Sequence, residues 1–390
     1  MVGHLGTTRS LIAKFNTMVQ KVCHLTSAHP RYDTRIFLKQ CRSLAVAGYR
    51  VTLVVADGKG NEVREGVEII DVGGREHNRL ARMTKTVSRV YRAALQTNSV
   101  LFHLHDPELM PIGLKLKRRG YAVIFDAHED VPKQLLSKPY LNLPIKWVLS
   151  KSFAVFERFV CRHIDGIIAA TPYIREKFTS MGDSAVDINN YPLPEELRSG
   201  KIDWKSKQAK VAYVGGISKI RGIIQMVEAM GQVKTDVKLQ LAGTFEDEET
   251  EQTAQSIIGW GNVEPLGFLG RKEIRDLLAQ SVAGLVTFLP APNHIDAQPN
   301  KMFEYMSAGL PVIASNFPLW KQIVDGNKCG LCVDPFDPKA VADAIDYLVS
   351  HPKEAEQMAK NGQTAVLEKY NWNIEEKKLF EFYNKIIGIE

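Results

Sequence analysis

The amino-acid sequence predicts an α/β protein built on two doubly wound parallel sheets. Short runs that are apolar on both faces alternate with amphipathic stretches, and this alternation occurs twice along the 390 residues. Strands without a polar face belong to sheets that helices cover on both sides, which is typical of parallel sheets. A chain of this length also exceeds what a single hydrophobic core usually supports. We therefore expect two domains.

The first series of alternating segments predicts an N-terminal domain at residues 1–192, in which residues 1–17 are a possible extension before the first strand. Its expected strands are 21–27, 50–56, 67–73, 99–105, 122–128 and 166–171. Amphipathic stretches lie between them and end at Gly48 and Gly120, because glycine commonly terminates a helix.

The pattern then breaks into Asn, Pro and charged residues, and we place a linker at 193–207. A second domain is expected at 208–369. Its strands are predicted at 210–215, 237–243, 262–268, 283–289, 311–315 and 330–335. In such sheets ligands bind at the carboxyl ends of the strands. Polar residues that follow strands are therefore the candidates for function.

Composition sets broad limits on partners and location. Lys and Arg number 50 against 44 Asp and Glu, a net charge of +6 that suits anionic small molecules or an acidic membrane surface. No nucleic-acid-binding motif occurs, so we expect no nucleic-acid partner. Five scattered cysteines favour a reducing compartment. No run approaches the roughly 20 apolar residues of a membrane span. We expect a cytoplasmic protein that can also lie at the inner face of the membrane.

Residues 298–315, QPNKMFEYMSAGLPVIAS, predict a short helix that begins near Pro299 and stops at Gly309. Free N–H groups at a helix start favour a phosphate, and Lys301 strengthens that attraction. A carboxylate one turn further on, Glu304, can accept paired hydroxyls such as those of a ribose. A surface helix with a weak Lys–Glu pair is the alternative, and spacing alone does not decide between the two.

A second candidate is VAYVGGISKIRGI, residues 211–223, in which a predicted strand ends at Gly215 and Gly216. Glycines let the backbone approach a ligand, and the helix start that follows can hold a phosphate. Lys219 and Arg221 add positive charge. The alternative is a solvated loop with two unrelated cations.

The segment PNKMFEYMSAGLPVIAS, followed by IVDGNKCGLCVDPFDPKAVADAI, resembles the carboxy-terminal signature of family 4 (group 1 type) glycosyltransferases. The resemblance covers nearly the whole chain from about residue 21. It implies a GT-B fold, in which two Rossmann-like domains face each other across a cleft. It also implies a retaining, metal-independent enzyme without a cofactor. The domain at 208–369 would bind a UDP- or GDP-sugar, and a C-terminal helix at about 370–390 would complete the acceptor-side N-terminal domain.

The resemblance also implies roles for single residues. Those expected at the donor are Gly215, Gly216, Asn300, Lys301 and Glu304. Arg221 matches a family cation that holds the diphosphate. Lys219 would replace a family arginine that this chain lacks. Asp296 takes the place of the first acid of the family's paired-acid motif, with a shorter side chain than the usual glutamate; a plain loop residue is the alternative.

Two polar clusters follow strands of the first domain, HLHDPELMPIG (103–113) and FDAHEDVP (125–132). Histidines and carboxylates can ligate zinc, but no HExxH spacing occurs and we expect no metal. The family implies that His128 lies near the reacting carbon of the sugar, with His105 and Asp106 on the acceptor side. Histidines bonded to local backbone are the alternative.

The polar loop SAHPRYDTRIFLKQ, residues 27–40, follows the first strand. Asp33 and Arg35 are candidates for contact with the acceptor or the diphosphate. Equally, Asp33 can cap the helix that starts near Thr34, and we favour the cap slightly.

A basic helical stripe is predicted at 78–96. Its members, spaced by threes and fours, are Arg79, Arg82, Lys85, Arg89 and Arg92. A solvated helix face explains this spacing. Contact with an anionic membrane is the second interpretation, since basic residues are attracted to acidic lipid.

Together these observations predict a glycosyltransferase that moves a sugar from a nucleotide diphosphate to an acceptor hydroxyl. The expected acceptor is a sugar or a lipid-linked molecule, in the assembly of lipid-linked oligosaccharide or surface polysaccharide. Two alternatives stay open: a nucleotide-sugar 2-epimerase on the same fold, and a non-catalytic protein that binds nucleotide-sugars.

Overall fold

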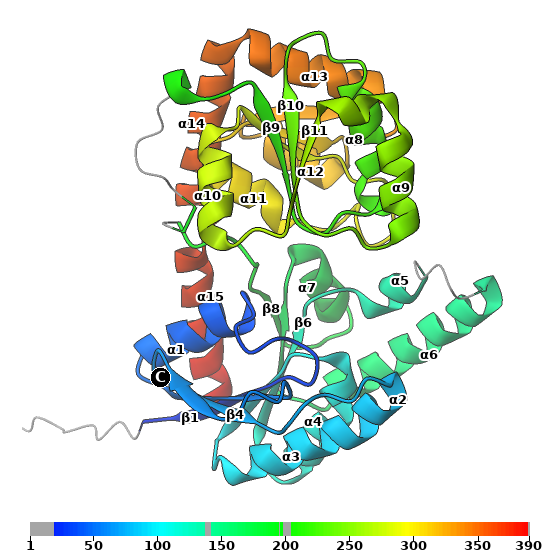
Figure 1. Ribbon diagram of the computed structural model, residues 1–390. Helices are drawn as coiled ribbons and strands as arrows, with labels where there is room; N and C mark the ends of the chain where they lie inside the picture. Colours follow the sequence, from blue (N-terminus) through cyan, green and yellow to red (C-terminus); the bar gives the residue numbers. More distant parts are fainter. Residues whose placement is uncertain (1–18, 137–141, 195, 198–203, 389–390) are drawn as a thin grey trace, which may run out of the picture.

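The computed structural model describes residues 19–136, 142–194, 196–197 and 204–388, which form two α/β lobes around two separate sheets (Figure 1). The predicted extension at 1–17 and part of the predicted linker lie outside the described residues. We call the units around the N-terminal and C-terminal sheets the first and second lobe.

The first sheet has the strand order β3-β4-β2-β1-β5-β6-β7-β8. Its strands are β1 (Lys21–Leu25), β2 (Arg50–Val55), β3 (Glu62–Arg64), β4 (Val67–Asp71), β5 (Leu101–Leu104), β6 (Ala122–Ala127), β7 (Gly166–Ala169) and β8 (Ala185–Asp187). Pairing is parallel throughout except between β3 and β4. The short edge strands β3 and β8 were not predicted, whereas the other strands of this sheet were.

The second sheet is parallel, with the order β11-β10-β9-β12-β13-β14. Its strands are β9 (Lys210–Val214), β10 (Lys238–Ala242), β11 (Val263–Gly267), β12 (Ala283–Val286), β13 (Val312–Ser315) and β14 (Gly330–Val333). Each of them was predicted from its apolar run. β9 and β12 lie at the centre, and their carboxyl ends lead into the site.

Helices cover both faces of each sheet (Figure 1). In the first lobe they are η1 (Ile36–Cys41), α1 (Arg42–Val46), α2 (Arg79–Ala81), η2 (Arg82–Thr86), α3 (Val87–Gln96), η3 (Pro107–Leu109), α4 (Met110–Arg118), α5 (Val131–Leu136), α6 (Leu143–Cys161) and α7 (Pro172–Thr179). In and beside the second lobe they are η4 (Trp204–Ser206), η5 (Lys219–Arg221), α8 (Ile223–Met230), α9 (Glu248–Ser256), η6 (Ile258–Asn262), α10 (Arg271–Gln280), α11 (Asn300–Ser307), α12 (Pro318–Val324), α13 (Pro338–Ser350) and α14 (Pro352–Glu368). None of the described helices is both long and apolar enough to cross a bilayer.

The last helix, α15 (Trp372–Ile387), packs on the first lobe although it follows the second in sequence (Figure 1). Trp372 and Tyr383 are fully buried there. The Trp372 indole donates to the Ser43 hydroxyl at 2.8 Å, and the Tyr383 hydroxyl lies 2.7 Å from His103 Nδ1. The core of the first lobe is thus built from both ends of the described chain.

The position of α11 is fixed by one close contact with the second sheet. A side chain at Gly284 of β12 would collide with the ring of Tyr305, so glycine lets the helix approach the sheet. The Tyr305 hydroxyl then accepts a hydrogen bond of 2.9 Å from the Val214 N–H at the end of β9. The first turn of α11 is thereby held at the carboxyl edge of the sheet.

The basic stripe expected at 78–96 forms the continuous run α2, η2 and α3, but its charges do not share one exposed face. Arg82 forms an ion pair of 2.8 Å with Glu108, and Arg89 donates to the Gly74 carbonyl at 2.7 Å. These two guanidinium groups are committed to the protein itself. The other three basic residues of the stripe are exposed.

Candidate active site

A cavity of about 690 Å³ lies between the two lobes, and side chains from both of them line it. Because both sheets are parallel, residues that follow different strands meet at this gap. The predicted site residues that line the cavity are Asp33, Arg35, His128, Gly215, Arg221, Asp296, Asn300, Lys301 and Glu304. The lining residues do not include Gly216, Lys219, His105 or Asp106.

Lys301, in the first turn of α11, has no polar partner for its amino group within the described part of the chain. The Nζ atom is buried and lies over two aromatic rings, 3.6 Å from the Tyr213 centroid and 5.2 Å from that of Phe288. Burial, followed by the positive charge of Arg221, lowers the pKa of Lys301 well below its usual range. Such an amino group becomes a stable cation when an anion lies beside it.

The glycines after β9 leave room for these two cations. Gly215 has φ +114°, and a Cβ there would lie 3.4 Å from Lys301 Nζ. A Cβ at Gly216 would collide with the guanidinium of Arg221, which donates to the Gly216 carbonyl at 2.9 Å. The missing side chains of this turn therefore let Lys301 and Arg221 approach its backbone.

Glu304 is held by a cation that the sequence analysis did not select. Arg271, the first residue of α10, donates to Glu304 Oε1 at 2.9 Å and to Glu196 Oε1 at 2.7 Å. Burial opposes it, but these two carboxylates raise the pKa of Arg271. A carboxylate has about four acceptor positions, so Glu304 keeps capacity for ligand hydroxyls while Arg271 orients it.

Asp296 joins the two lobes across the cavity. Its carboxylate accepts from Lys133 of α5 at 3.0 Å, and both side chains line the gap. Lys133 Nζ also lies 4.3 Å from the ring centroid of Tyr173. Asp296 is therefore placed in the site, although its partner comes from the first lobe.

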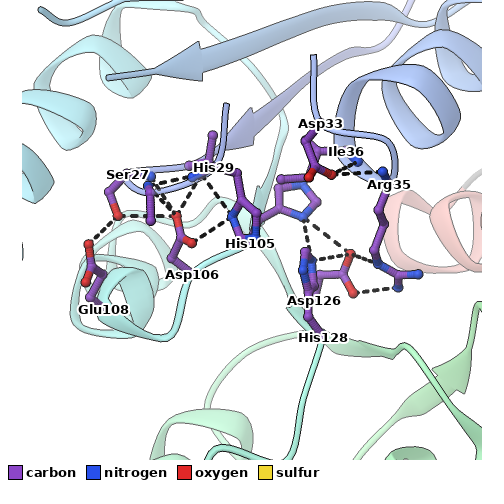
Figure 2. A network of polar contacts seen from close by, with 12 residues as sticks. Ser27, His29, Asp33, Arg35, Ile36, His105, Asp106, Glu108, Asp126 and His128 are labelled. Carbon is purple, nitrogen blue, oxygen red and sulfur yellow. Dashed lines mark hydrogen bonds and ion pairs between the residues drawn. The ribbon is translucent and has the colours of Figure 1, made fainter. Parts of the chain in front are cut away.

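His128 lies on the first-lobe wall and is held by a buried carboxylate, Asp126 (Figure 2). His128 Nε2 is 3.2 Å from Asp126, and His105 Nδ1 is 3.3 Å away. Arg35 donates two hydrogen bonds to Asp126, of 2.9 and 2.7 Å, and a third to the Ile188 carbonyl. Burial opposes ionisation, but Arg35 first and then the histidines hold the pKa of Asp126 well below its usual range.

Two residues expected on the acceptor side are instead buried behind the cavity wall. His105 bonds to His24 at 2.8 Å as well as to Asp126, and burial lowers the pKa of His105 to about 3. Asp106 accepts from the Ser27 N–H at 2.6 Å and from the Thr26 hydroxyl at 2.8 Å, and lies 2.9 Å from His29 (Figure 2). Neither residue lines the cavity, so any part they take on the acceptor side is as support for the wall behind it.

Asp33 and Arg35 both line the cavity, and both also bond to the protein itself. Asp33 Oδ1 accepts from the backbone N–H groups of Arg35 and Ile36 at 2.8 and 2.9 Å, which is the capping role we favoured from the sequence. Arg35 lines the cavity, but its guanidinium is committed to Asp126 and the Ile188 carbonyl. Both residues shape the wall, and Arg35 also holds Asp126, the partner of His128.

Lys219 does not face the cavity. Its side chain is half exposed and forms an ion pair of 2.5 Å with Glu249 on the outside of the second lobe. The cation expected to replace the missing family arginine is therefore not Lys219 in this structure. Arg221 and Arg271 bring positive charge to that wall, and the amino group of Lys301 lies there with them.

Two groups in the described residues have donor atoms close enough to hold a metal ion, within 4.8 Å of one another. One is His24, His103 and His105; the other is His105, Asp126 and His128. In the first group His24 bonds to both His105 and Tyr383, so its ring nitrogens are already used. The second group shares its aspartate with Arg35, a cation that competes with a metal.

Comparison with known families identifies the chain. The family described as glycosyl transferases group 1 matches residues 195–365, and the glycosyl transferase 4-like domain matches residues 34–190. The chain belongs to the group 1 glycosyltransferases. The family resemblance seen in the sequence is thereby confirmed.

Among curated relatives, this group 1 glycosyltransferase is 23% identical to phosphatidyl-myo-inositol mannosyltransferase of Mycobacterium leprae, over 77% of each chain. Among solved structures, it is similar to sucrose-phosphate synthase of Thermosynechococcus elongatus, with TM-score 0.75, 18% identity, and coverage of 95% of this chain and 100% of that one. It is also similar to Anabaena HepE in complex with UDP and glucose, with TM-score 0.71, 14% identity, and coverage of 94% and 100%. These similarities confirm the GT-B fold.

Proposed function

We propose that the chain transfers a sugar from a nucleotide diphosphate sugar to an acceptor hydroxyl, with retention at the anomeric carbon. The observation that carries this proposal is the buried amino group of Lys301, which lacks a counter-ion among the described residues and lies beside Arg221. Burial of an amino group without a partner costs free energy. A diphosphate at the start of α11 would supply the missing charge, and helix N-termini favour phosphate in any case.

The second lobe would bind the donor. The backbone at Gly215, with Asn300 and Lys301, would hold the diphosphate, and Gly216 would contribute by leaving room for Arg221. Glu304 would accept hydrogen bonds from the ribose hydroxyls while Arg271 fixes its orientation. The structure of HepE with UDP supports a uridine nucleotide, and a GDP-sugar is the other donor we would test.

Catalysis in this proposal is mainly electrostatic. Arg221 and Lys301 would stabilise the negative charge that grows on the departing diphosphate, and the walls of the gap would exclude water. His128, fixed by Asp126, would face the reacting carbon from the first lobe, and Asp296 would contact the transferred sugar. We expect no metal requirement, because protein cations already serve the diphosphate. Unchanged turnover in excess EDTA is the result expected on this account.

The acceptor would enter from the first-lobe wall. We propose a sugar or lipid-linked acceptor used in the synthesis of lipid-linked oligosaccharide or surface polysaccharide, on the cytoplasmic side of a membrane. The name of the mannosyltransferase relative, which includes a phospholipid, supports a lipid-linked acceptor. The exposed part of the basic run at 78–96 is one surface that could lie near such a membrane.

The first experiment is a thermal-shift screen against UDP-, GDP- and ADP-sugars, with K301M and K219A as a matched pair of lysine variants. Saturation with donor should stabilise the wild type by about 2.7 kcal/mol at a hundredfold excess over Kd. K219A should respond equally, and K301M should respond weakly or not at all. Equal shifts in melting temperature for the wild type, K301M and K219A would show that Lys301 does not bind the donor.

The second experiment incubates the best donor with and without candidate acceptors and follows the products by NMR. A glycoside with the anomeric configuration of the donor, formed only with acceptor, is the expected result. An isomerised nucleotide-sugar formed from donor alone would favour the 2-epimerase. Tight donor binding without any product across the acceptor panel would favour a non-catalytic binding protein.

A further inference from the structure

Helix α6 of the first lobe exposes an unusual number of large apolar side chains. They are Leu143, Ile145, Trp147, Val148, Leu149, Val155 and Phe159. Leu143 is 80% exposed, Val155 71% and Trp147 59%. Single exposed apolar residues are ordinary, but a run of them on one element marks a contact surface.

The helix has a well-anchored opposite face, so its exposure is not a sign of poor packing. Ser150 is buried and donates to the Pro132 carbonyl at 2.9 Å. Val160 and Cys161 are buried in the first-lobe core. Asn142 caps the start of the helix by accepting from the Ile145 N–H at 3.1 Å. Figure 1 shows the N-terminal half of α6 extending outward from the first lobe.

The exposed face combines an apolar stripe with positive charge. Val148, Val155 and Phe159 stand at i, i+7 and i+11, which places them in one line along the helix. Lys151 and Arg158 are exposed beside that line. Lys151 Nζ lies 6.0 Å from the ring centroid of Trp147, so the cation and the indole share the same side.

The acidic residue of α6 points the other way. Glu157 is buried and accepts from Lys177 at 2.6 Å, so α6 adds no carboxylate of its own to the exposed face. In a twofold dimer the same patch meets itself, which would bring Lys151 and Arg158 together with their own copies. Repulsion between these like charges disfavours a second copy of the chain on this face. An anionic surface, in contrast, complements the positive charges.

We propose that the exposed face of α6 docks the protein on an anionic lipid bilayer. Apolar side chains enter the interface between headgroups and acyl chains, a tryptophan settles at headgroup level, and basic residues meet lipid phosphates. This assignment makes α6, rather than the basic run at 78–96, the main membrane-contacting element. Docking itself does not depend on the transferase activity.

A chain of ion pairs connects this helix to the edge of the cavity. Lys177 of α7 lies 2.6 Å from Glu157 of α6 and 2.9 Å from Asp130, and Asp130 lines the cavity. The proposed docking helix is thus tied through its buried face to the first-lobe wall of the gap. Delivery of a lipid-linked acceptor from the bilayer rests on the proposed function, so the test below measures binding without turnover.

The test is cosedimentation of the full chain with vesicles of phosphatidylcholine alone and of phosphatidylcholine mixed with phosphatidylglycerol. The wild type should bind the mixed vesicles more tightly. W147S/V155S should lose binding by about tenfold or more, because burial of apolar side chains drives insertion. K151Q/R158Q should lose about twenty-five-fold on the anionic vesicles and little on the neutral ones, since each basic residue contributes about fivefold.

Matched controls lie on the second lobe. I258S/F336S removes two exposed apolar side chains, and K328Q/K353Q removes two exposed charges. Both should bind as the wild type does, and all variants should melt with it, since the substituted side chains are exposed. Absence of vesicle binding by the wild type would overturn the proposal. Equal loss in the controls, or a wild-type dimer that W147S/V155S dissociates, would overturn it as well.

Discussion

Two basic side chains on facing walls of the cavity, Arg35 of the first lobe and Lys301 of the second, are both withdrawn from water but have opposite surroundings. Arg35 donates twice to Asp126 and once to the Ile188 carbonyl. Lys301 lies on the rings of Tyr213 and Phe288 without a polar partner among the described residues. The charge of Arg35 is neutralised inside the protein, whereas Lys301 is left to pair with an anion that binds.

This difference indicates which of the two side chains stabilises the protein and which one binds a ligand. A buried ion pair with good geometry positions the residues around it, and breaking it leaves an uncompensated charge. A buried amino group without a partner destabilises the free protein, and its charged form becomes favourable when an anion binds beside it. The first-lobe wall should therefore respond to mutation through stability, and the second-lobe wall through ligand binding.

The largest expected effect is that of K301M on turnover. Loss of a preorganised charge at the leaving group should reduce kcat/KM by about a thousandfold. The melting temperature should stay unchanged or rise slightly, because the variant removes a buried polar group that has no partner. Steady-state kinetics and thermal melts measure both. If K301M has a lower melting temperature than the wild type but keeps its activity, Lys301 serves stability and not ligand binding.

Arg35 should show the opposite behaviour. R35M leaves Asp126 buried without its main counter-ion and should lower the free energy of unfolding by about 3–5 kcal/mol. Chemical denaturation measures this loss. Adding D126N to R35M should restore part of it, because the neutral amide removes the unpaired charge. If R35M proves as stable as the wild type, the pair is not what holds this wall.

The first lobe should also lose stability in mild acid. Burial first, and then neighbouring histidines, lowers the pKa of His24 and of His103, and burial lowers that of His105 to about 3. The unfolded chain, with histidine pKa values near 6.5, therefore binds more protons below that pH. Each of the three should remove up to about 1.4 kcal/mol of stability per pH unit between roughly pH 6.5 and 5.

Unfolding free energies measured from pH 7.5 to 5 test this slope. His29 works in the opposite direction: burial opposes it, but Asp106 raises its pKa, so its stabilising effect is present in acid. The stability that this one histidine gains in acid is smaller than the stability that the other three lose. A flat profile would mean that the histidine cluster takes up protons in the folded state.

E304Q should act on donor affinity more than on the chemical step. Loss of the charged acceptor should raise the KM for the donor by about tenfold to a hundredfold, since hydrogen bonds to charged groups are worth about 1.5–3 kcal/mol. The amide is isosteric, and Arg271 keeps Glu196 as a partner. A change confined to kcat would move Glu304 from the ribose to the reacting centre.

K219A should have the smallest effect. The side chain is half exposed and pairs with Glu249 away from the cavity, so kcat/KM should stay within about twofold of the wild type, as for an exposed ion pair. Parallel assays of K219A and K301M give the comparison directly. A large loss in K219A would require the turn at η5 to rearrange when the donor binds.

The strands and helices could be predicted because each one is encoded by a short, continuous pattern in the sequence. Long apolar runs such as 50–56 and 283–289 identify strands buried on both faces, and the structure places β2 and β12 there. The edge strands β3 and β8 escaped detection because each has three residues, too few for a pattern. α11 was recognisable from its proline at the start and glycine at the end.

The parts of the site that were missed depend on contacts between distant residues. Asp126 reads as an ordinary polar position in a strand, since its partner Arg35 lies 91 residues earlier. Arg271 could be recognised as a site residue only from its contact with Glu304, 33 residues later. Lys219 was misplaced because sequence does not reveal the direction of a side chain on a short turn; Arg221, two positions on, points to Gly216.

The return of α15 to the first lobe has a consequence for biosynthesis. Domains usually fold in order as the chain leaves the ribosome. Here Trp372, Leu379 and Tyr383 belong to the core of the first lobe, where Tyr383 bonds to both His24 and His103. The half of the molecule that is made first thus stays unfinished until the second has been synthesised. The hydroxyl that bonds to His103 and His24 is translated 280 and 359 residues after them.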